Sequence, residues 1–245
     1  MTFVRVEGLI KIYRTKTTEV VALRGVNLSV PQGGVAVITG PSGSGKTSLL
    51  NVIAGLEPPS AGSVSVKGLR VNDLSDSQLA DYRRNVVGYI FQSFNLVSFL
   101  TVSQNVALPM YLNGSSAADC RQRSEDLLES VGLASRAGRF PRSLSGGEQQ
   151  RAAIATALCN DPPVILADEP TAELDTEAGA AILGLLSDLS QSAGRTLLLV
   201  SHDERANRIG GSHYRIIDGT LSADNLDAVD LRSPPERMSS HVGHE

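Results

Sequence analysis

The chain has 245 residues, 41% of them hydrophobic, a formal net charge of −4 and two cysteines. That length fits one large α/β domain that needs no metal or disulfide to stabilise its core. The acidic balance argues against a general nucleic-acid binder, and no stretch approaches the roughly 18 apolar residues of a membrane helix. Cys120 and Cys159 lie outside any CxxC motif, so we expect reduced thiols in a cytosolic protein.

The chain begins with a pattern that predicts β structure. Apolar residues recur at period two from Val4 to Val30, the N-terminus lacks the apolar region of a signal peptide, and Pro31 to Gly34 supplies a turn. A short apolar strand at 35–38 then leads into the glycine-rich stretch 40–45 and a helix that ends near Gly55.

Strands and helices continue to alternate along the chain. We expect further strands at 63–66, 164–167 and 196–200, and helices at 75–82, 117–131 and 145–158. This alternation predicts an α/β fold with a mostly parallel sheet that helices cover on both faces. The apolar pattern fades from about Ser222, so we predict one domain over 1–225 and a polar, mobile tail over 226–245.

Residues 40–47 fit the GxxxxGK[ST] pattern of a phosphate-binding loop. Glycines let backbone N–H groups wrap around phosphate oxygens, and the helix that follows points its positive N-terminal dipole at the anion. Lys46 is expected to reach the β- and γ-phosphates, and the Thr47 hydroxyl to bind Mg²⁺. A chance glycine-rich turn would lack the flanking strand and helix, so a nucleoside triphosphate is the predicted ligand. The predicted binding residues here are Gly40, Pro41, Ser42, Gly43, Ser44, Gly45, Lys46, Thr47 and Ser48.

The apolar strand at 164–167 ends in two carboxylates, Asp168 and Glu169. Asp168 is expected to hold the Mg²⁺ shell, and Glu169 to act as general base on a water near the γ-phosphate. A solvated strand end would look the same in isolation, but the phosphate loop favours the catalytic interpretation. A kinase would need a site for a second substrate, and no sequence feature provides one.

Residues 144–151, Leu-Ser-Gly-Gly-Glu-Gln-Gln-Arg, form a second candidate anion site. Ser145, Gly146 and Gly147 at a helix N-terminus would expose N–H donors and a hydroxyl, although Ser-Gly-Gly is also a common N-cap. Together with the phosphate loop, this stretch resembles the signature motif of ATP-binding cassette (ABC) ATPases. The resemblance covers about residues 3–220. Its other landmarks occur in order and are Tyr13, Phe91-Gln92, Leu174-Asp175 and Val200-Ser201-His202-Asp203.

The resemblance implies a P-loop NTPase (RecA-like) core with an antiparallel β subdomain. It also implies an inserted α-helical subdomain, about residues 93–160, that carries the signature motif. ABC ATPase domains pair head to tail, so two MgATP would lie between the phosphate loop of one copy and the signature motif of the other. The signature residues expected at that interface are Ser145, Gly146, Gly147 and Glu148.

The same resemblance implies roles for single residues. Tyr13 would stack on adenine, Gln92 would sense Mg²⁺ and water, and His202 would contact the γ-phosphate and Glu169. The expected catalytic residues are Glu169, His202, Gln92 and Lys46, the expected metal ligands are Thr47, Gln92 and Asp168, and Asp175 is expected to contribute to nucleotide binding. Without the resemblance, each of these residues has an ordinary interpretation. Tyr13 would be an aromatic residue in a strand, Gln92 a solvated amide in a loop, and His202 a structural histidine.

Residues 91–112 look most like the lipoprotein-release and macrolide-efflux branch of the family. That branch implies an ATPase homodimer on the cytoplasmic face of the membrane, driving a separate four-helix (MacB/FtsX-like) permease, with no nucleic acid. Three stretches depart from the branch pattern without removing a catalytic group: Thr156, Ala172-Glu173 and Gly210-Gly211-Ser212.

Other family functions stay open from the sequence. A solute-importer ATPase shares these motifs, and so does a regulatory ATPase that gates a cell-wall hydrolase through a permease-like partner. A soluble ABC protein of translation or DNA repair would usually add a second cassette or a coiled-coil insertion. The apolar cluster Phe94, Leu96, Val97, Phe99 and Leu100 fits either core packing or a groove for a permease helix.

Overall fold

The structure is a computed structural model that describes residues 2–15, 17–192 and 194–224. Its strands are β1 (Thr2–Arg14), β2 (Glu19–Pro31), β3 (Val35–Thr39), β4 (Ala61–Val66), β5 (Leu69–Arg70), β6 (Val87–Ile90), β7 (Val164–Asp168), β8 (Thr196–Ser201), β9 (Ser212–Ile217) and β10 (Thr220–Ala223). Its helices are α1 (Lys46–Ile53), α2 (Asp76–Asn85), α3 (Val102–Leu112), α4 (Ala117–Ser130), α5 (Gly146–Leu158) and α6 (Thr176–Ser192).

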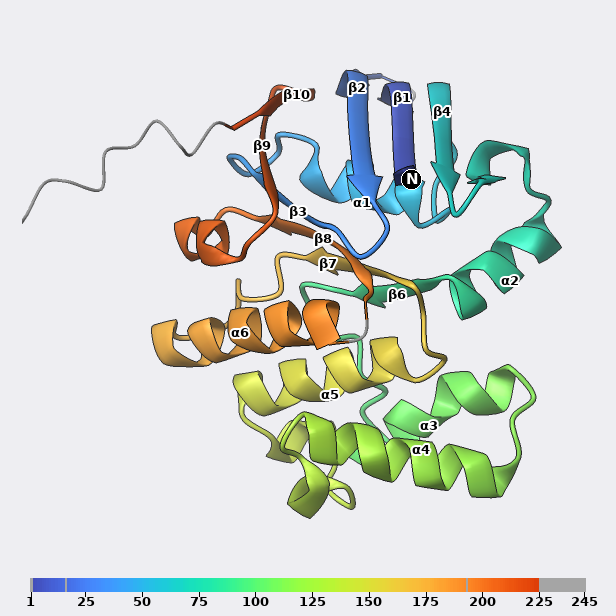
Figure 1. Cartoon of the computed structure of the whole chain (residues 1–245), viewed down its shortest axis with the longest axis vertical. Helices are drawn as coiled ribbons and strands as arrows, with labels where there is room; N and C mark the ends of the chain where they lie inside the picture. The colour runs from blue at the N-terminus through green and yellow to red at the C-terminus, as the bar shows by residue number, and fades with distance from the viewer. Residues whose placement is uncertain (1, 16, 193, 225–245) are drawn as a thin grey trace, which may run out of the picture.

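The strands form two sheets (Figure 1). The smaller sheet has the order β2-β1-β4-β5 with antiparallel pairing. The larger sheet has the order β10-β9-β3-β8-β7-β6, in which β9, β3, β8, β7 and β6 pair in parallel and β10 pairs antiparallel to β9. The predicted α/β class with a mostly parallel main sheet is confirmed.

Each face of the larger sheet has its own hydrophobic core, because side chains alternate along its central strands. In β7, Val164 and Leu166 face a core shared with α1 and the antiparallel sheet, whereas Ile165 and Ala167 face a core shared with α3 to α6. Figure 1 shows α1 between the sheets, α5 and α6 on the opposite face, and α3 and α4 beyond α5. The central strands are therefore apolar on both faces, with polar residues only at their ends.

Most predicted elements are present, with small shifts at their ends. Ser75 and Ser145 were expected inside helices but are N-caps, each in a reciprocal capping box that satisfies backbone donors at the helix start. The apolar pattern fades at Ser222, yet β10 includes this residue. The predicted tail at 226–245 lies outside the described residues.

Two features bear on the expectations from composition. Cys120 and Cys159 are free and buried, and burial raises the pKa of the Cys159 thiol to about 11. Among the residues that the structure describes, no helix combines the length and the hydropathy that a bilayer crossing requires.

The parallel strands bring four segments of the chain together. In a parallel sheet the carboxyl ends of all strands lie at the same edge, where α/β proteins bind ligands. The phosphate loop follows β3, Gln92 follows β6, Glu169 follows β7 and His202 follows β8. Residues far apart in the sequence thus meet at one edge.

Candidate functional site: a nucleotide cleft at the sheet edge

A cleft of about 660 Å³ opens at this edge, beside the phosphate loop. Its lining includes nine of the predicted site residues: Tyr13, Ser42, Gly43, Gly45, Lys46, Thr47, Ser48, Gln92 and Glu169. Gly40, Pro41 and His202 line a second hollow of about 320 Å³. The structure thus brings the predicted phosphate loop together with Glu169 and His202 at the strand ends and with Tyr13.

The phosphate loop is held tightly by its surroundings. Gly45 has φ +105°, and a Cβ there would lie 2.4 Å from the Ala22 carbonyl oxygen. A Cβ on Gly40 would lie 2.2 Å from the Ile216 carbonyl oxygen. Glycine is therefore required at both ends of the loop, which lets the backbone approach neighbouring strands while its N–H groups remain near the cleft.

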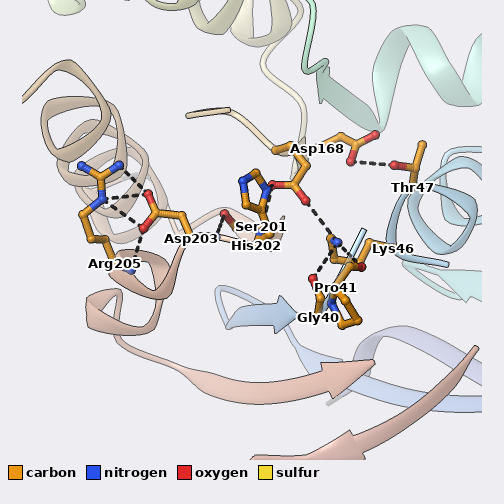
Figure 2. A network of polar contacts seen from close by, with 10 residues as sticks. Gly40, Pro41, Lys46, Thr47, Asp168, Ser201, His202, Asp203 and Arg205 are labelled. Atoms are coloured by element: carbon orange, nitrogen blue, oxygen red, sulfur yellow. Dashed lines mark hydrogen bonds and ion pairs between the residues drawn. The ribbon is translucent and has the colours of Figure 1, made fainter. Parts of the chain in front are cut away.

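Lys46 is buried and bound by three oxygens. Its ammonium donates to the carbonyls of Gly40 (2.8 Å) and Pro41 (2.9 Å) and lies 3.2 Å from Glu169 Oε1 (Figure 2). A buried charge is stable only when it is paired and hydrogen-bonded. The loop therefore holds a fixed positive charge beside the cleft.

Asp168 accepts hydrogen bonds on both carboxylate oxygens. The Thr47 hydroxyl donates to Oδ1 at 3.0 Å (Figure 2), and the Tyr89 hydroxyl lies 3.4 Å from Oδ2. Burial raises the pKa of Asp168 above its ordinary value, the Thr47 hydrogen bond lowers it, and the neighbouring Glu169 charge raises it. The carboxylate sits where it can orient the Thr47 hydroxyl.

Glu169 has an unusual backbone and a well-defined side chain. Its φ is +47°, which is uncommon for a residue with a Cβ. Oε2 accepts the backbone N–H of His202 at 3.0 Å and lies 2.7 Å from His202 Nδ1. Oε1 faces Lys46, so the carboxylate lies between the imidazole and the ammonium and is only 7% exposed.

Asp203 and Arg205 support the segment that carries His202. The Asp203 carboxylate accepts from Arg205 Nε, which lowers the pKa of Asp203 (Figure 2). Arg205 also donates to the Thr176 carbonyl at 2.6 Å. The histidine segment is thereby tied to the first residue of α6.

Tyr13 lies on β1 and lines the cleft. Its hydroxyl donates to Ser48 Oγ at 3.1 Å, and the Lys11 ammonium is 4.8 Å from its ring centre. Lys11 in turn pairs with Glu57 at 2.9 Å. These contacts hold the aromatic ring in place at the cleft wall.

The signature residues do not line the cleft of their own chain. The Ser145 side chain accepts the N–H of Glu148, and the Glu148 carboxylate accepts the Ser145 N–H and pairs with Arg136 at 2.9 Å. The Arg136 hydrogen bond is the main reason why the pKa of Glu148 lies below its usual value. Asp175 also lies outside the cleft lining, where it accepts the Ala178 N–H.

The donor set fits Mg²⁺. The Thr47 hydroxyl, the Gln92 amide and the Asp168 carboxylate supply the hard oxygen ligands that this ion prefers. The described residues hold no cluster of three or more histidines, cysteines or carboxylates, so an ion here would complete its shell with water or phosphate oxygens. That is the usual way in which proteins bind Mg²⁺ with a nucleotide.

The comparison with known proteins decides the family. Residues 23–172 match the protein family described as ABC transporter. The chain belongs to the ABC transporter ATPase family. As an ABC ATPase it binds MgATP and hydrolyses it.

This ABC ATPase is similar to transporter subunits of different kinds. It is 38% identical to the lipoprotein-releasing system ATP-binding protein LolD of Alcanivorax borkumensis, over 87% of this chain and 93% of LolD. It is also 38% identical to the methionine import ATP-binding protein MetN of Rhodopseudomonas palustris, over 96% of this chain and 63% of MetN. Identity alone therefore does not separate an exporter from an importer.

A solved structure has the same fold. The cassette MJ0796 of Methanocaldococcus jannaschii, solved as a dimer in a post-hydrolysis state with ADP and Pi, superposes with a TM-score of 0.84. It is 38% identical, and the match covers 90% of this chain and 97% of that one. The predicted P-loop NTPase class is confirmed.

Sequence reasoning missed several residues at the cleft. Six further residues line it: Val20, Val21, Ala22, Arg24, Asp218 and Gly219. Arg24 Nε donates to the Asp218 carbonyl at 3.0 Å, which joins β2 to the β9–β10 turn. The Asp-Gly pair signals a turn in the sequence, but only the sheet order shows that this turn reaches the cleft.

Proposed function

We propose that this ABC ATPase drives a separate membrane permease of the lipoprotein-release or macrolide-efflux type, from the cytoplasmic face of the membrane. The observation that carries the proposal is a third hollow, of about 560 Å³, whose lining includes residues just before and just after Gln92 in the sequence. Apolar side chains that line this groove include Tyr89, Phe91, Phe94, Pro109 and Leu112. The similarity to LolD over nearly the whole length of both chains supports the branch.

The groove and the nucleotide cleft are lined by the same short segment of chain, so a change in the bound nucleotide would reach the groove. Gln92 lines the cleft, and Phe91 and Phe94 on either side of it line the groove. Of the apolar cluster predicted after Gln92, Phe94 lines the groove, Leu96 packs against the core, and Phe99 is 78% exposed outside the groove. A short amphipathic permease helix is the partner that suits an apolar groove of this kind.

The proposed chemistry assigns one task to each group in the cleft. Glu169 Oε2 accepts from His202, so the carboxylate is oriented to take a proton from an attacking water. Lys46 would exchange Glu169 and the loop carbonyls for phosphate oxygens. Thr47, Gln92 and Asp168 would hold Mg²⁺, which when bound neutralises charge on the phosphates.

The proposed active unit is a head-to-tail homodimer. Ser145 is exposed and lies outside the cleft of its own chain, so it is available to a second copy. The helix N-terminus behind it directs backbone N–H groups outward, which suits an anion held by the partner. The dimeric MJ0796 cassette supports this arrangement.

The test of the chemistry is Glu169→Gln. If Glu169 is the base, this variant binds MgATP as the natural chain does but loses at least about 10²-fold in hydrolysis, the scale of general-base loss. It should also accumulate as an ATP-bound dimer in size-exclusion chromatography. A variant that hydrolyses ATP at the normal rate would remove Glu169 from this role and make His202 the next candidate.

The test of the partner compares Phe94→Asp with Phe99→Asp. Both variants add one charge to the same segment, but only Phe94 lines the groove. We expect Phe94→Asp to abolish co-purification with a co-expressed LolD-partner-type permease and to leave ATP binding intact. Phe99→Asp should co-purify normally. Equal retention of both variants would place the contact elsewhere, and a stable complex with an importer permease instead would assign the importer branch.

A further inference from the structure

Tyr89 contacts both the apolar groove and a residue beside the nucleotide cleft. It lies on β6, three residues before Gln92, and its ring lines the groove and stacks on Phe91 with a centroid distance of 4.2 Å. Its hydroxyl points away from the groove, towards Asn51 Oδ1 at 3.0 Å and Asp168 Oδ2 at 3.4 Å. One side chain therefore contacts both the apolar groove and the carboxylate beside the phosphate loop.

The hydroxyl has one hydrogen and two acceptors. Asn51 Oδ1 has no proton to give, so the tyrosine donates to it, and the same hydrogen is shared with the more distant Asp168 Oδ2. The pKa of Tyr89 is raised above its ordinary value, first by burial and then by the negative charge of Asp168.

This donor acts on the oxygen that Thr47 leaves free. Thr47 donates to Oδ1 of Asp168, and Tyr89 is the donor near Oδ2, so the two hydroxyls fix the plane of the carboxylate. Asp168 is 5% exposed, so its carboxylate is enclosed by these partners. A carboxylate held on both oxygens is already oriented when a divalent cation binds.

Asn51 holds the tyrosine oxygen in turn. Its amide nitrogen donates to Glu57 Oε1 at 3.1 Å, and Glu57 pairs with the buried Lys11 at 2.9 Å. Asn51 thus has its amide oxygen fixed towards Tyr89 by a bond on its opposite side. The hydroxyl position is therefore set by a chain of contacts through α1 and β1 before any metal binds.

We propose that Tyr89 is a positioning residue for the magnesium site, acting through Asp168. The hydroxyl holds the Asp168 carboxylate in the orientation in which it supports the Mg²⁺ shell with Thr47. The effect belongs to the isolated ATPase chain and does not depend on which permease it serves. The proposal rests on the proposed role of Asp168 in the metal shell. The Glu169→Gln experiment does not test that role, so the two can fail independently.

The test is the Mg²⁺ dependence of nucleotide binding in Tyr89→Phe. This change removes one oxygen and keeps the ring that stacks on Phe91 and lines the groove. We expect the Mg²⁺ concentration at half-saturation, followed with a fluorescent ATP analogue, to rise about three- to tenfold. That is less than the roughly 10- to 100-fold typical of partners that orient metal ligands, because the hydroxyl is shared with Asn51. Affinity for the analogue in EDTA should not change.

Tyr82→Phe is the matched control. Tyr82 is 3% exposed, and its hydroxyl donates to the Ile53 carbonyl at 2.7 Å, so the change also removes one buried hydrogen bond near α1. It should lower the melting temperature without moving the Mg²⁺ midpoint. An unshifted midpoint in Tyr89→Phe, or equal shifts in both variants, would overturn the proposal.

A measurement on the unmodified chain covers the case in which Tyr89→Phe folds poorly. With tyrosine labelled with ¹³C at Cζ, the Tyr89 resonance should shift when Mg²⁺ is added to the ADP complex, because Asp168 then shares its charge with the ion. The Tyr82 resonance should stay in place. A Tyr89 signal that does not respond to Mg²⁺ would contradict the proposal as directly as an unshifted midpoint.

Discussion

Asp168 shows how one residue can weaken the fold and serve the site. Its carboxylate is buried beside Glu169, and its pKa is raised mainly by that burial. The folded chain therefore binds a proton at Asp168 more tightly than the unfolded chain does. The stability that follows is present below the unfolded pKa and is lost as the pH rises through the folded pKa. At neutral pH the charged carboxylate is a cost in the absence of a cation.

We therefore expect Asp168→Asn to raise the melting temperature of the metal-free protein at pH 7. Each kcal/mol of gain would move the midpoint by about 2–4 °C in a chain of this size. The gain should vanish below about pH 4, where the carboxyl is protonated in both states. Mg²⁺ and nucleotide should stabilise the variant less than the natural chain. Scanning calorimetry at both pH values, with and without ligand, checks this; a lower midpoint at pH 7 would contradict it.

At the scale of residues, the sequence predicts groups that act locally and misses those that act across strands. Asp168 and Glu169 come at the end of an apolar strand, and Lys46 belongs to a phosphate-loop motif with specific spacing. All three residues could therefore be identified from the sequence. Tyr89 contacts Asp168 across 79 residues of sequence. Its ring fits the apolar pattern of β6, and only the pairing of β6 with β7 places its hydroxyl beside the carboxylate.

At the scale of elements, Gly45 of the phosphate loop and Gly184 of α6 differ in what surrounds them. Gly45 has a positive φ and a carbonyl 2.4 Å from its would-be Cβ, whereas Gly184 within α6 is exposed with nothing within 4 Å. The first glycine is required by its surroundings. The second carries only the entropic cost of glycine in a helix.

Two alanine variants test this difference. Gly184→Ala should stabilise the chain by about 0.5–1 kcal/mol, the usual gain in helix propensity, with unchanged ATPase activity. Gly45→Ala should lower the melting temperature and abolish nucleotide binding, because the loop must shift to admit the Cβ. Thermal unfolding and nucleotide titration of the pair suffice. A Gly45→Ala chain that binds nucleotide normally would show that the loop is not held as tightly as its contacts indicate.

Elements with a clear period or a strong cap were predictable, and the others were not. The buried strands β3, β7 and β8 are continuous apolar runs between turns, and α5 begins with a Ser-x-x-Glu capping box. Helix α3 contains Pro109 and follows an apolar loop, which hides its period. The strands β9 and β10 lie at the edge of the sheet and are partly polar, so their pattern resembles a loop.

At the scale of the whole molecule, the two anion-binding features of the chain do not share a cleft. Lys46 lines the cleft at the sheet edge, whereas Ser145 is an exposed cap on α5 and lies outside that lining. In the proposed dimer, a second copy in the opposite orientation would supply Ser145 to the phosphate loop of the first and complete the site.

This arrangement predicts complementation between two inactive variants. Lys46→Ala removes the cation of the phosphate loop, and Ser145→Arg blocks the signature motif, so each variant alone should be inactive. A mixed dimer holds one site built from an intact Lys46 and an intact Ser145, and ATPase activity should return when the two are mixed. As a control, Ser145→Arg mixed with a chain carrying both changes has no intact site and should stay inactive. Zero activity at every mixing ratio, with mixed dimers demonstrated by two affinity tags, would rule out the head-to-tail arrangement.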